Sequence, residues 1–136
     1  MTADELISAV ALEYGVAGED ICSTTRGPLL DEAKRAAHYL VRQNTSLGWK
    51  PLAALFRCSY ANTRFKVTFA TRQIWTDDAF AGRVRGLEEK LGLKKTVDDV
   101  REMAESELPP DLSPSGSKNL KRADIAGARV YQRGDA

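Results

Sequence analysis

The segment WKPLAALFRCSYANTRFKVTFATRQIW, residues 49–75, determines the fold that we expect for this chain. Pro51 suits the first turn of a helix, because the backbone N–H that proline lacks has no partner in that turn. This helix should end near Phe56, and Ser59 is placed to cap a longer helix that runs to about Trp75, with a tight turn between them. The layout predicts a helix-turn-helix, in which the second helix presents side chains to the major groove of DNA.

Side chains near the start of that second helix are the natural candidates for contact with base pairs. Asn62 can pair with adenine and Arg64 with guanine, while Thr63 can offer its methyl group to thymine. We expect these three side chains to project from one exposed ridge. With the neighbouring cations and the capping serine, the predicted DNA-binding residues are Lys34, Arg35, Lys50, Ser59, Tyr60, Asn62, Thr63, Arg64 and Lys66.

The charge of the chain is strongly segregated. Residues 33–75 contain eight Lys or Arg and no Asp or Glu, whereas residues 1–32 carry a net charge of −6 and residues 76–115 a net charge of −4. The net charge of +1 for the whole chain therefore conceals a segment at +8. A positive surface without local carboxylates attracts polyanions, because neutralised phosphates supply most of the affinity of a nucleic-acid binder. The alternative is that these cations only solvate helix surfaces.

Helical periodicity dominates the rest of the chain, and no stretch shows convincing strand alternation. Besides the two helices above, the pattern predicts a short helical turn near 19–22 and longer helices over 3–14, 30–43, 77–91 and 97–108. After Leu108 the sequence becomes rich in Pro, Ser and Gly. We therefore expect an all-α fold, with a compact helical domain over 1–108 around a central helix-turn-helix and a flexible, disordered basic tail over 109–136.

The same periodicity predicts which side chains face the core. In helix 30–43 the basic and imidazole side chains should lie mostly off the buried stripe: Lys34, Arg35, His38 and Arg42. His38 should be a surface or boundary residue. In the helix after Ser59, the expected inward positions include Phe65, Phe69 and Ile74. Thr96, with Asp99 three residues later, should cap the last helix, which Pro109 and Pro110 would end.

Several classes of function find no support in the sequence. There is no Gly-rich phosphate loop and no Cys/His spacing for zinc, so we expect neither a cofactor nor a metal. Glu88 and Glu89 diverge by about 100° on a helix and form no acid/base pair, and we expect no enzymatic activity. No apolar run approaches the ~20 residues of a membrane span, and no signal peptide is evident. These observations favour a cytoplasmic, nucleoid-associated protein.

Three blocks of sequence point to a known family. AHYLVR at 37–42 is followed by WKPLAALF at 49–56 and by ATRQI at 70–74. In order and spacing they resemble the patterns Ala-x-Tyr-Leu-x-Arg, Leu-Pro-Glu-Ile-Gly-x-x-Phe and Ala-Cys-Arg-Lys-Ile of the C-terminal DNA-binding domain of the bacterial replication initiator DnaA. The resemblance covers roughly Tyr14 to Leu91. This chain is a few residues longer after Phe56, and it does not preserve the family's Asp-His-Thr signature.

The resemblance implies a helix-turn-helix that binds double-stranded DNA. Lys34 matches a basic residue that the family inserts into the minor groove, at the start of its second long helix, whereas Glu32 stands where the family has Arg. The initiator's ATPase domain has no counterpart here. The resemblance therefore favours a stand-alone module that acts in transcription regulation or replication initiation.

Two other functions remain open from the sequence. The chain could be a protein-interaction adaptor, which would use its acidic helices and would bind a protein partner through the basic tail from Lys118 onward. RNA binding is a weaker third possibility. The DNA hypothesis differs from both because it predicts a basic groove built from Lys34, Arg35, Lys50, Arg64 and Lys66.

Overall fold

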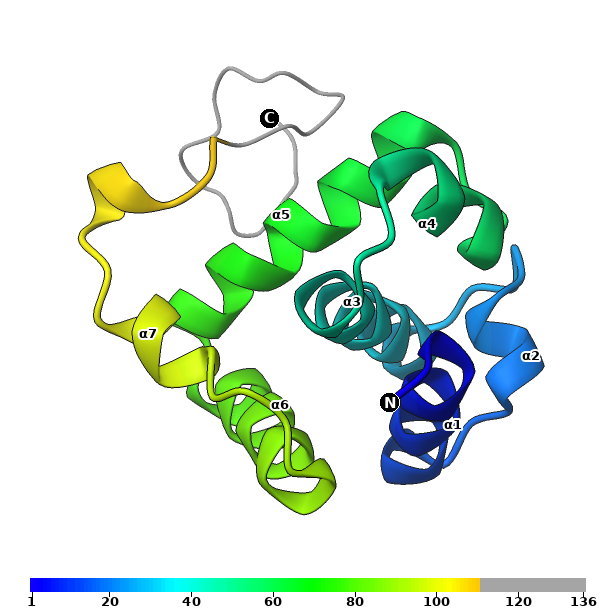
Figure 1. Ribbon diagram of the computed structural model, residues 1–136, viewed down its shortest axis with the longest axis horizontal. Coiled ribbons are helices and arrows are strands. Elements are labelled where there is room, and N and C mark those ends of the chain that lie inside the picture. Colours follow the sequence, from blue (N-terminus) through cyan, green and yellow to red (C-terminus); the bar gives the residue numbers. More distant parts are fainter. Residues whose placement is uncertain (111–136) are drawn as a thin grey trace.

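The computed structural model describes residues 1–110, and these residues form helices joined by short connections (Figure 1). The predicted all-α class is confirmed. The basic tail predicted for 109–136 lies, from residue 111 onward, outside the described residues. The elements, in chain order, are α1 (Ala3–Tyr14), α2 (Gly18–Ile21), α3 (Pro28–Asn44), α4 (Trp49–Phe56), α5 (Tyr60–Thr76), α6 (Asp78–Leu91), α7 (Val97–Arg101) and the 3-10 turn η1 (Glu105–Glu107).

Caps that can be read in the sequence fix both ends of α1 and the end of α6. Thr2 and Glu5 form the expected capping box, in which each side chain accepts a hydrogen bond from the other residue's backbone N–H. Gly15 and Gly92 end α1 and α6 with φ of 67° at both positions. Only glycine adopts this left-handed conformation without steric cost, so both helices end where the sequence predicts.

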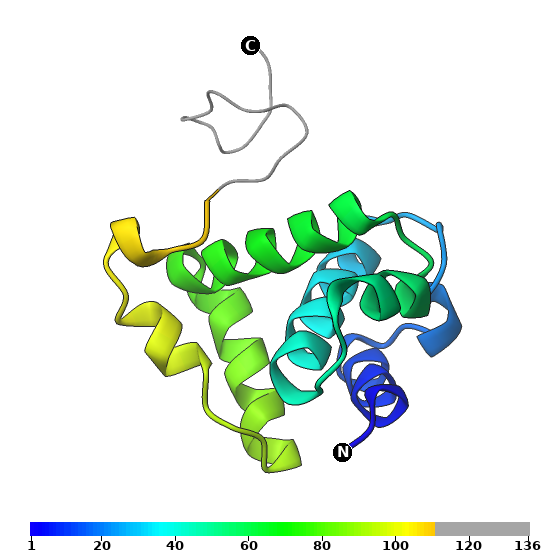
Figure 2. The same cartoon turned by 45° about the horizontal axis from the view of Figure 1, so that its top comes forward.

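Helix α3 lies at the centre of the fold. It packs against α1 and α2 on one side and against α4 and α5 on the other, while α6 and α7 cover the far end of α5 (Figures 1 and 2). Ala33, Ala36 and Ala37 are fully buried, and such small side chains let neighbouring helices approach closely. Larger buried residues fill the remaining space, among them Leu6, Ile21, Tyr39, Leu40, Phe56, Ile74 and Phe80.

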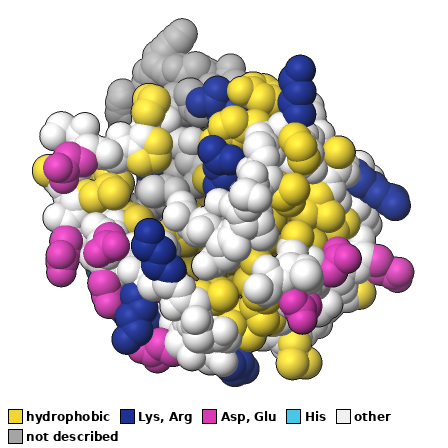
Figure 3. Space-filling model, in the orientation of Figure 1, with side chains coloured by type: hydrophobic (Ala, Val, Ile, Leu, Met, Phe, Trp, Pro, Cys, Tyr) yellow, Lys and Arg dark blue, Asp and Glu magenta, His cyan; other side chains and the backbone are white. Residues whose placement is uncertain are grey.

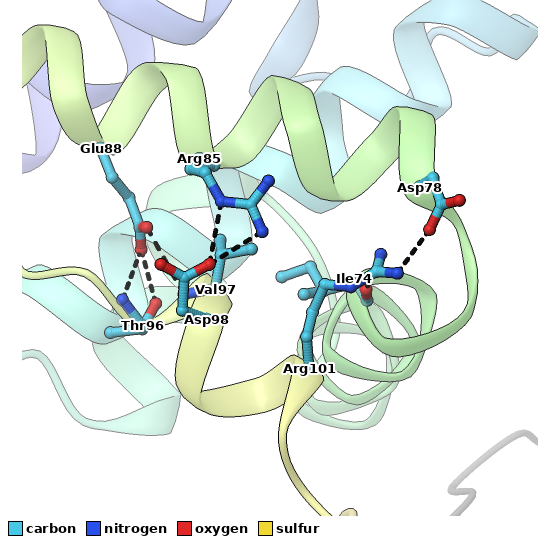
Figure 4. Close-up of polar contacts among 8 residues, drawn as sticks. All are labelled: Ile74, Asp78, Arg85, Glu88, Thr96, Val97, Asp98 and Arg101. Carbon is cyan, nitrogen blue, oxygen red and sulfur yellow. Dashed lines mark hydrogen bonds and ion pairs between the residues drawn. The ribbon is translucent and has the colours of Figure 1, made fainter.

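Helix α7 begins on a carboxylate supplied by α6 (Figure 4). The Glu88 side chain is 1% exposed. It accepts hydrogen bonds from the backbone N–H of Thr96 at 2.9 Å, from the Thr96 hydroxyl at 2.6 Å and from the backbone N–H of Val97 at 3.4 Å. Because the Thr96 hydroxyl donates to Glu88, it accepts from the Tyr39 hydroxyl of α3, 2.6 Å away. Burial raises the pKa of Tyr39 to about 12, so this phenol remains a donor.

The last predicted helix is shorter than expected. Val97 does begin a helix, but α7 ends at Arg101 instead of continuing to Leu108. The Thr96 side chain makes no capping bond to its own helix, since Glu88 takes that role. After α7 the Met103 carbonyl accepts a bond from the Trp75 indole N–H at 2.9 Å, and Leu108 returns to the core. These contacts with α5 and the core divert the chain before the two prolines.

His38 is a core residue, and its prediction as a surface or boundary residue is wrong. Its ring is 0% exposed and stacks on Phe56, with 3.8 Å between ring centroids and an interplanar angle of 22°. Nδ1 lies 2.8 Å from the Lys34 carbonyl oxygen, which can only accept, so Nδ1 carries the proton. Nε2 faces the Cys58 thiol at 4.0 Å. The imidazole therefore joins α3 to α4 as a neutral ring.

The buried imidazole makes the stability of the fold dependent on pH. Burial, aided by the positive charges of Lys66 and Lys34, lowers the pKa of His38 from 6.5 to about 3. Below pH 6.5 the His38 imidazole therefore binds a proton in the unfolded chain but stays neutral in the folded chain. The free energy of unfolding falls as the pH falls. Between about pH 7.5 and 5 we expect a loss of about 2 kcal/mol in the free energy of unfolding. Urea titrations across this range measure it.

The matched variant is His38→Leu, which keeps an apolar group at the site but has no proton to bind. Its free energy of unfolding should change far less over the same pH range. The carboxyl groups with a lowered pKa are Glu5, Asp31 and Asp77, whose ordinary values of 4.5, 3.8 and 3.8 lie below this window and whose contribution is the same in both proteins. Parallel pH curves for the natural protein and His38→Leu would refute the assignment.

Candidate nucleic-acid interface

Helices α4 and α5 are joined by residues 57–59, in the predicted helix-turn-helix layout. The N–H of Cys58 bonds the Ala53 carbonyl at 3.0 Å and the N–H of Arg57 bonds the Ala54 carbonyl at 3.2 Å. This is a Schellman ending, in which Arg57 takes the left-handed conformation with φ of 55°. Ser59 then caps α5 by accepting from the Asn62 N–H at 3.0 Å. Arginine thus occupies a turn position where glycine is usual.

This strained residue gives a direct test of the turn. Arg57 has the one positive φ among the non-glycine residues of 1–110, and a left-handed L-residue costs roughly 1–2 kcal/mol. Arg57→Gly removes that cost but adds freedom to the unfolded chain, so we expect a net gain of about 0.5–1 kcal/mol in stability. Thermal unfolding monitored by circular dichroism measures it. A melting temperature below that of the natural protein would contradict this turn geometry.

The predicted DNA-binding residues do not all reach the surface. Lys50, Ser59, Tyr60 and Asn62 are exposed, and Arg35, Arg64 and Lys66 are half-buried. Lys34 and Thr63 are buried, with 4% and 0% of their surfaces exposed. The ridge expected from Asn62, Thr63 and Arg64 is therefore not a single exposed surface. Arg35 is set apart because its guanidinium donates to Gln73 at 3.0 Å and lies over the Phe69 ring. With the exposed Arg57 of the turn, the other available residues form what we call the contact face: Lys50, Arg57, Ser59, Tyr60, Asn62, Arg64 and Lys66.

Lys34 stabilises the fold and does not reach the surface that would contact a DNA groove. Because α3 begins at Pro28, Lys34 lies in its second turn and not at its start. Its ammonium group donates to the carbonyl of Ser23 at 2.8 Å and to that of Thr25, which ties the preceding loop to α3. The ammonium group is thus occupied by two carbonyls and buried, which does not favour its predicted insertion into the minor groove. Glu32, which replaces a basic residue of the family pattern, accepts from the Tyr14 hydroxyl at 2.6 Å.

Thr63 faces inward because it belongs to the buried stripe of α5. Thr63, Val67, Ala70 and Ile74 follow one another at three- and four-residue spacing and are all buried. Its hydroxyl oxygen has no hydrogen-bond partner among the described residues. The same stripe explains a second correction, because it leaves Phe65 and Phe69 outside the core. The helical spacing of residues 63, 67, 70 and 74 can be read in the sequence. The larger apolar side chains of Phe65 and Phe69 instead led to the prediction of a different inward face.

Two arginines and two aromatic rings form a cluster at the edge of the contact face. The Arg42 guanidinium lies 4.0 Å from the Trp49 ring centroid, and the Arg64 guanidinium lies 5.3 Å from the same centroid. Arg64 also lies 5.7 Å from the Tyr60 ring and donates to the Tyr60 hydroxyl at 3.3 Å. Cation–π contacts of this kind hold guanidinium groups in place without neutralising them. The sequence prediction did not include Arg42 among the DNA-binding residues.

The contact face carries positive charge that no carboxylate offsets. Of the eight cations in residues 33–75, Arg72 is the one with a carboxylate partner among the described residues, Glu105 at 4.0 Å. That pair lies toward the far end of α5. Figure 3 shows dark blue and yellow side chains together over the upper part of the face, where α5 runs, whereas magenta side chains lie toward the left, the right and the lower margins. A polyanion approaching α4 and α5 therefore meets an attractive potential.

Two other features were sought in the part of the chain that the structure describes, a metal-binding cluster and a membrane-spanning helix. Residues 1–110 contain no cluster of three or more His, Cys, Asp or Glu side chains that could hold a metal ion. No helix in this range combines the length and the apolar character needed to cross a bilayer. In a comparison with protein-family models, none matches this chain.

Proposed function

We propose that this protein binds double-stranded DNA, with α5 placed in the major groove as a recognition helix and α4 crossing the backbone. The observation that carries the proposal is the contact face. It combines a helix-turn-helix turn, exposed hydrogen-bonding side chains at the start of α5 and cations free of carboxylate partners. These are the features by which such modules dock on duplex DNA.

The contact face divides into two kinds of contact. Lys50, Arg57 and Lys66 carry charge on both sides of the turn, which suits phosphate groups and makes affinity dependent on salt. Asn62 and Tyr60 lie in the first turn of α5, where recognition helices place the side chains that reach base edges. Phosphate contacts position the protein, and base contacts select the sequence.

The resemblance to the DNA-binding domain of DnaA supports a more specific role. We propose a small transcription regulator or a replication-associated factor that recognises defined sites. The burial of Lys34 removes the minor-groove contact that the resemblance implied, so site selection here depends on α5 and the cations around it.

The test is selection from a pool of short random-sequence duplexes at about 50 mM salt, a concentration at which phosphate contacts are strong. We expect the full-length protein to retain duplexes, to enrich a shared motif over successive rounds and to lose affinity steeply as salt rises. Failure to retain any duplex at this salt would contradict the proposal. Retention of a structured RNA pool in preference to the duplex pool would also contradict it.

A further inference from the structure

Two phenylalanines on α5 have no role in the core. Phe69 is 42% exposed and Phe65 is half-buried, and neither belongs to the buried cluster or to the half-buried residues packed against it. Their rings pack edge to face with each other, with 5.6 Å between centroids and 79° between planes. The Arg35 guanidinium lies 4.7 Å from the Phe69 ring centroid. Within residues 1–110, folding alone gives no reason for an exposed aromatic pair at this position.

The pair continues a row that starts at the tip of the recognition helix. Ala61, Phe65 and Phe69 are spaced four residues apart, so they follow one another along one side of α5, and Ala61 is exposed. We call these three residues the apolar row. Asn62 and Lys66 of the contact face run beside it. The apolar row therefore borders the contact face on the surface that would enter the groove, beside side chains that can form hydrogen bonds with bases or phosphates.

Duplex DNA offers such a row one apolar partner in the major groove. Base edges there present hydrogen-bond donors and acceptors, and the C5 methyl group of thymine is the apolar feature, which Ala and Phe side chains contact. Stacking on unpaired bases needs free aromatic faces that successive bases can use. Here the two rings stand at 79° to one another and Arg35 covers Phe69, so the pair does not offer two parallel faces.

We propose that the apolar row reads thymine methyl groups, with Phe65 as the main specificity-determining residue and Ala61 and Phe69 on either side of it. The inference deepens the proposed function, on which it rests, by naming the feature of the DNA that α5 selects. It predicts that preferred sites contain thymines at the positions facing Phe65. Each contacted methyl group should contribute about four-fold in affinity, the value of one buried methylene.

The experiment uses the full-length protein and duplexes enriched from the random pool, prepared either with thymine or with uracil at every thymine position. Uracil lacks the methyl group but keeps the same base pairing. For the natural protein we expect the uracil form to bind more weakly by about four-fold for each methyl group contacted. Phe65→Ala should lose most of this preference, because only Ala61 and Phe69 of the apolar row keep their side chains, and Phe65→Leu should retain more of it.

Leu12→Ala is the matched control, because Leu12 is an apolar side chain 80% exposed on α1. It should show the same thymine preference as the natural protein. Equal binding of both forms by the natural protein, or an unchanged preference in Phe65→Ala, would overturn the inference while leaving duplex binding intact. Tighter binding of a single-stranded pool, lost in Phe65→Ala, would overturn it in favour of base stacking. No retention of any DNA would overturn both proposals together.

Discussion

Replacing Glu88 with alanine is expected to lower the free energy of unfolding by about 3 kcal/mol, because it removes a buried acceptor and leaves buried donors without partners. The carboxylate holds the backbone N–H and the hydroxyl of Thr96 together with the N–H of Val97. The Tyr39 hydroxyl is joined to the same network through Thr96. The loss should therefore affect the packing of both α6 and α7 on the centre of the fold. Urea titration at neutral pH measures it.

The neighbouring residue provides the control. Glu89 has the same side chain and lies on the same helix, but it is exposed and its carboxylate accepts no hydrogen bond within residues 1–110. Glu89→Ala should change stability by no more than about 0.5 kcal/mol. Glu88→Gln should fall between the two, since it keeps one acceptor oxygen and the shape of the side chain. Equal effects of the two alanine variants would contradict the buried network.

The double variant Lys50→Gln with Lys66→Gln is expected to reduce affinity for duplex DNA by about a hundred-fold at ~50 mM salt. Counterion release contributes about ten-fold for each phosphate contact at that concentration. The slope of log affinity against log salt should become shallower by about 2. Both lysines belong to the contact face, and neither ammonium group has a hydrogen-bond or carboxylate partner within residues 1–110. Fluorescence anisotropy of a labelled duplex over a salt series measures both quantities.

Lys94→Gln with Lys95→Gln is the matched control, because it removes the same charge from two exposed lysines in the connection between α6 and α7. That connection lies on the opposite side of the molecule from α4 (Figure 1). The control should change affinity little and leave the slope nearly unchanged. If both double variants weaken binding equally, the attraction comes from overall charge, and the contact face is not the binding surface.

The secondary structure could be predicted because its signals are local. The Thr2–Glu5 box, Gly15, Ser59 and Gly92 each act within a turn of helix, and the structure confirms all four. The prediction for α7 was wrong because Glu88, eight residues before Thr96, supplies the cap and α5 diverts the chain after it. A contact between elements leaves no periodic signal in either of them.

Helical periodicity did not predict which polar side chains would be buried. Lys34 and His38 lie on helix α3, which contacts α1, α2, α4 and α5. Because these neighbours surround α3, residues outside its one predicted apolar stripe are also buried. The reverse happened on α5, where two large apolar residues suggested the wrong inward face. Thr63 is buried and Phe69 is exposed because the side of α5 that carries Thr63, Val67 and Ala70 faces the interior. Hydrophobicity alone favours the opposite choice.

Amide chemical shifts of the protein titrated with a short enriched duplex test the central claim most directly, because they show which surface meets DNA. The account predicts that the largest changes occur at Lys50 and across 57–66, with smaller changes along α5 as far as Phe69. The amides of α1, α6 and α7 should change little. Changes concentrated on the acidic helices α6 and α7, or no changes at all with the duplex in excess, would contradict the claim that the contact face binds DNA.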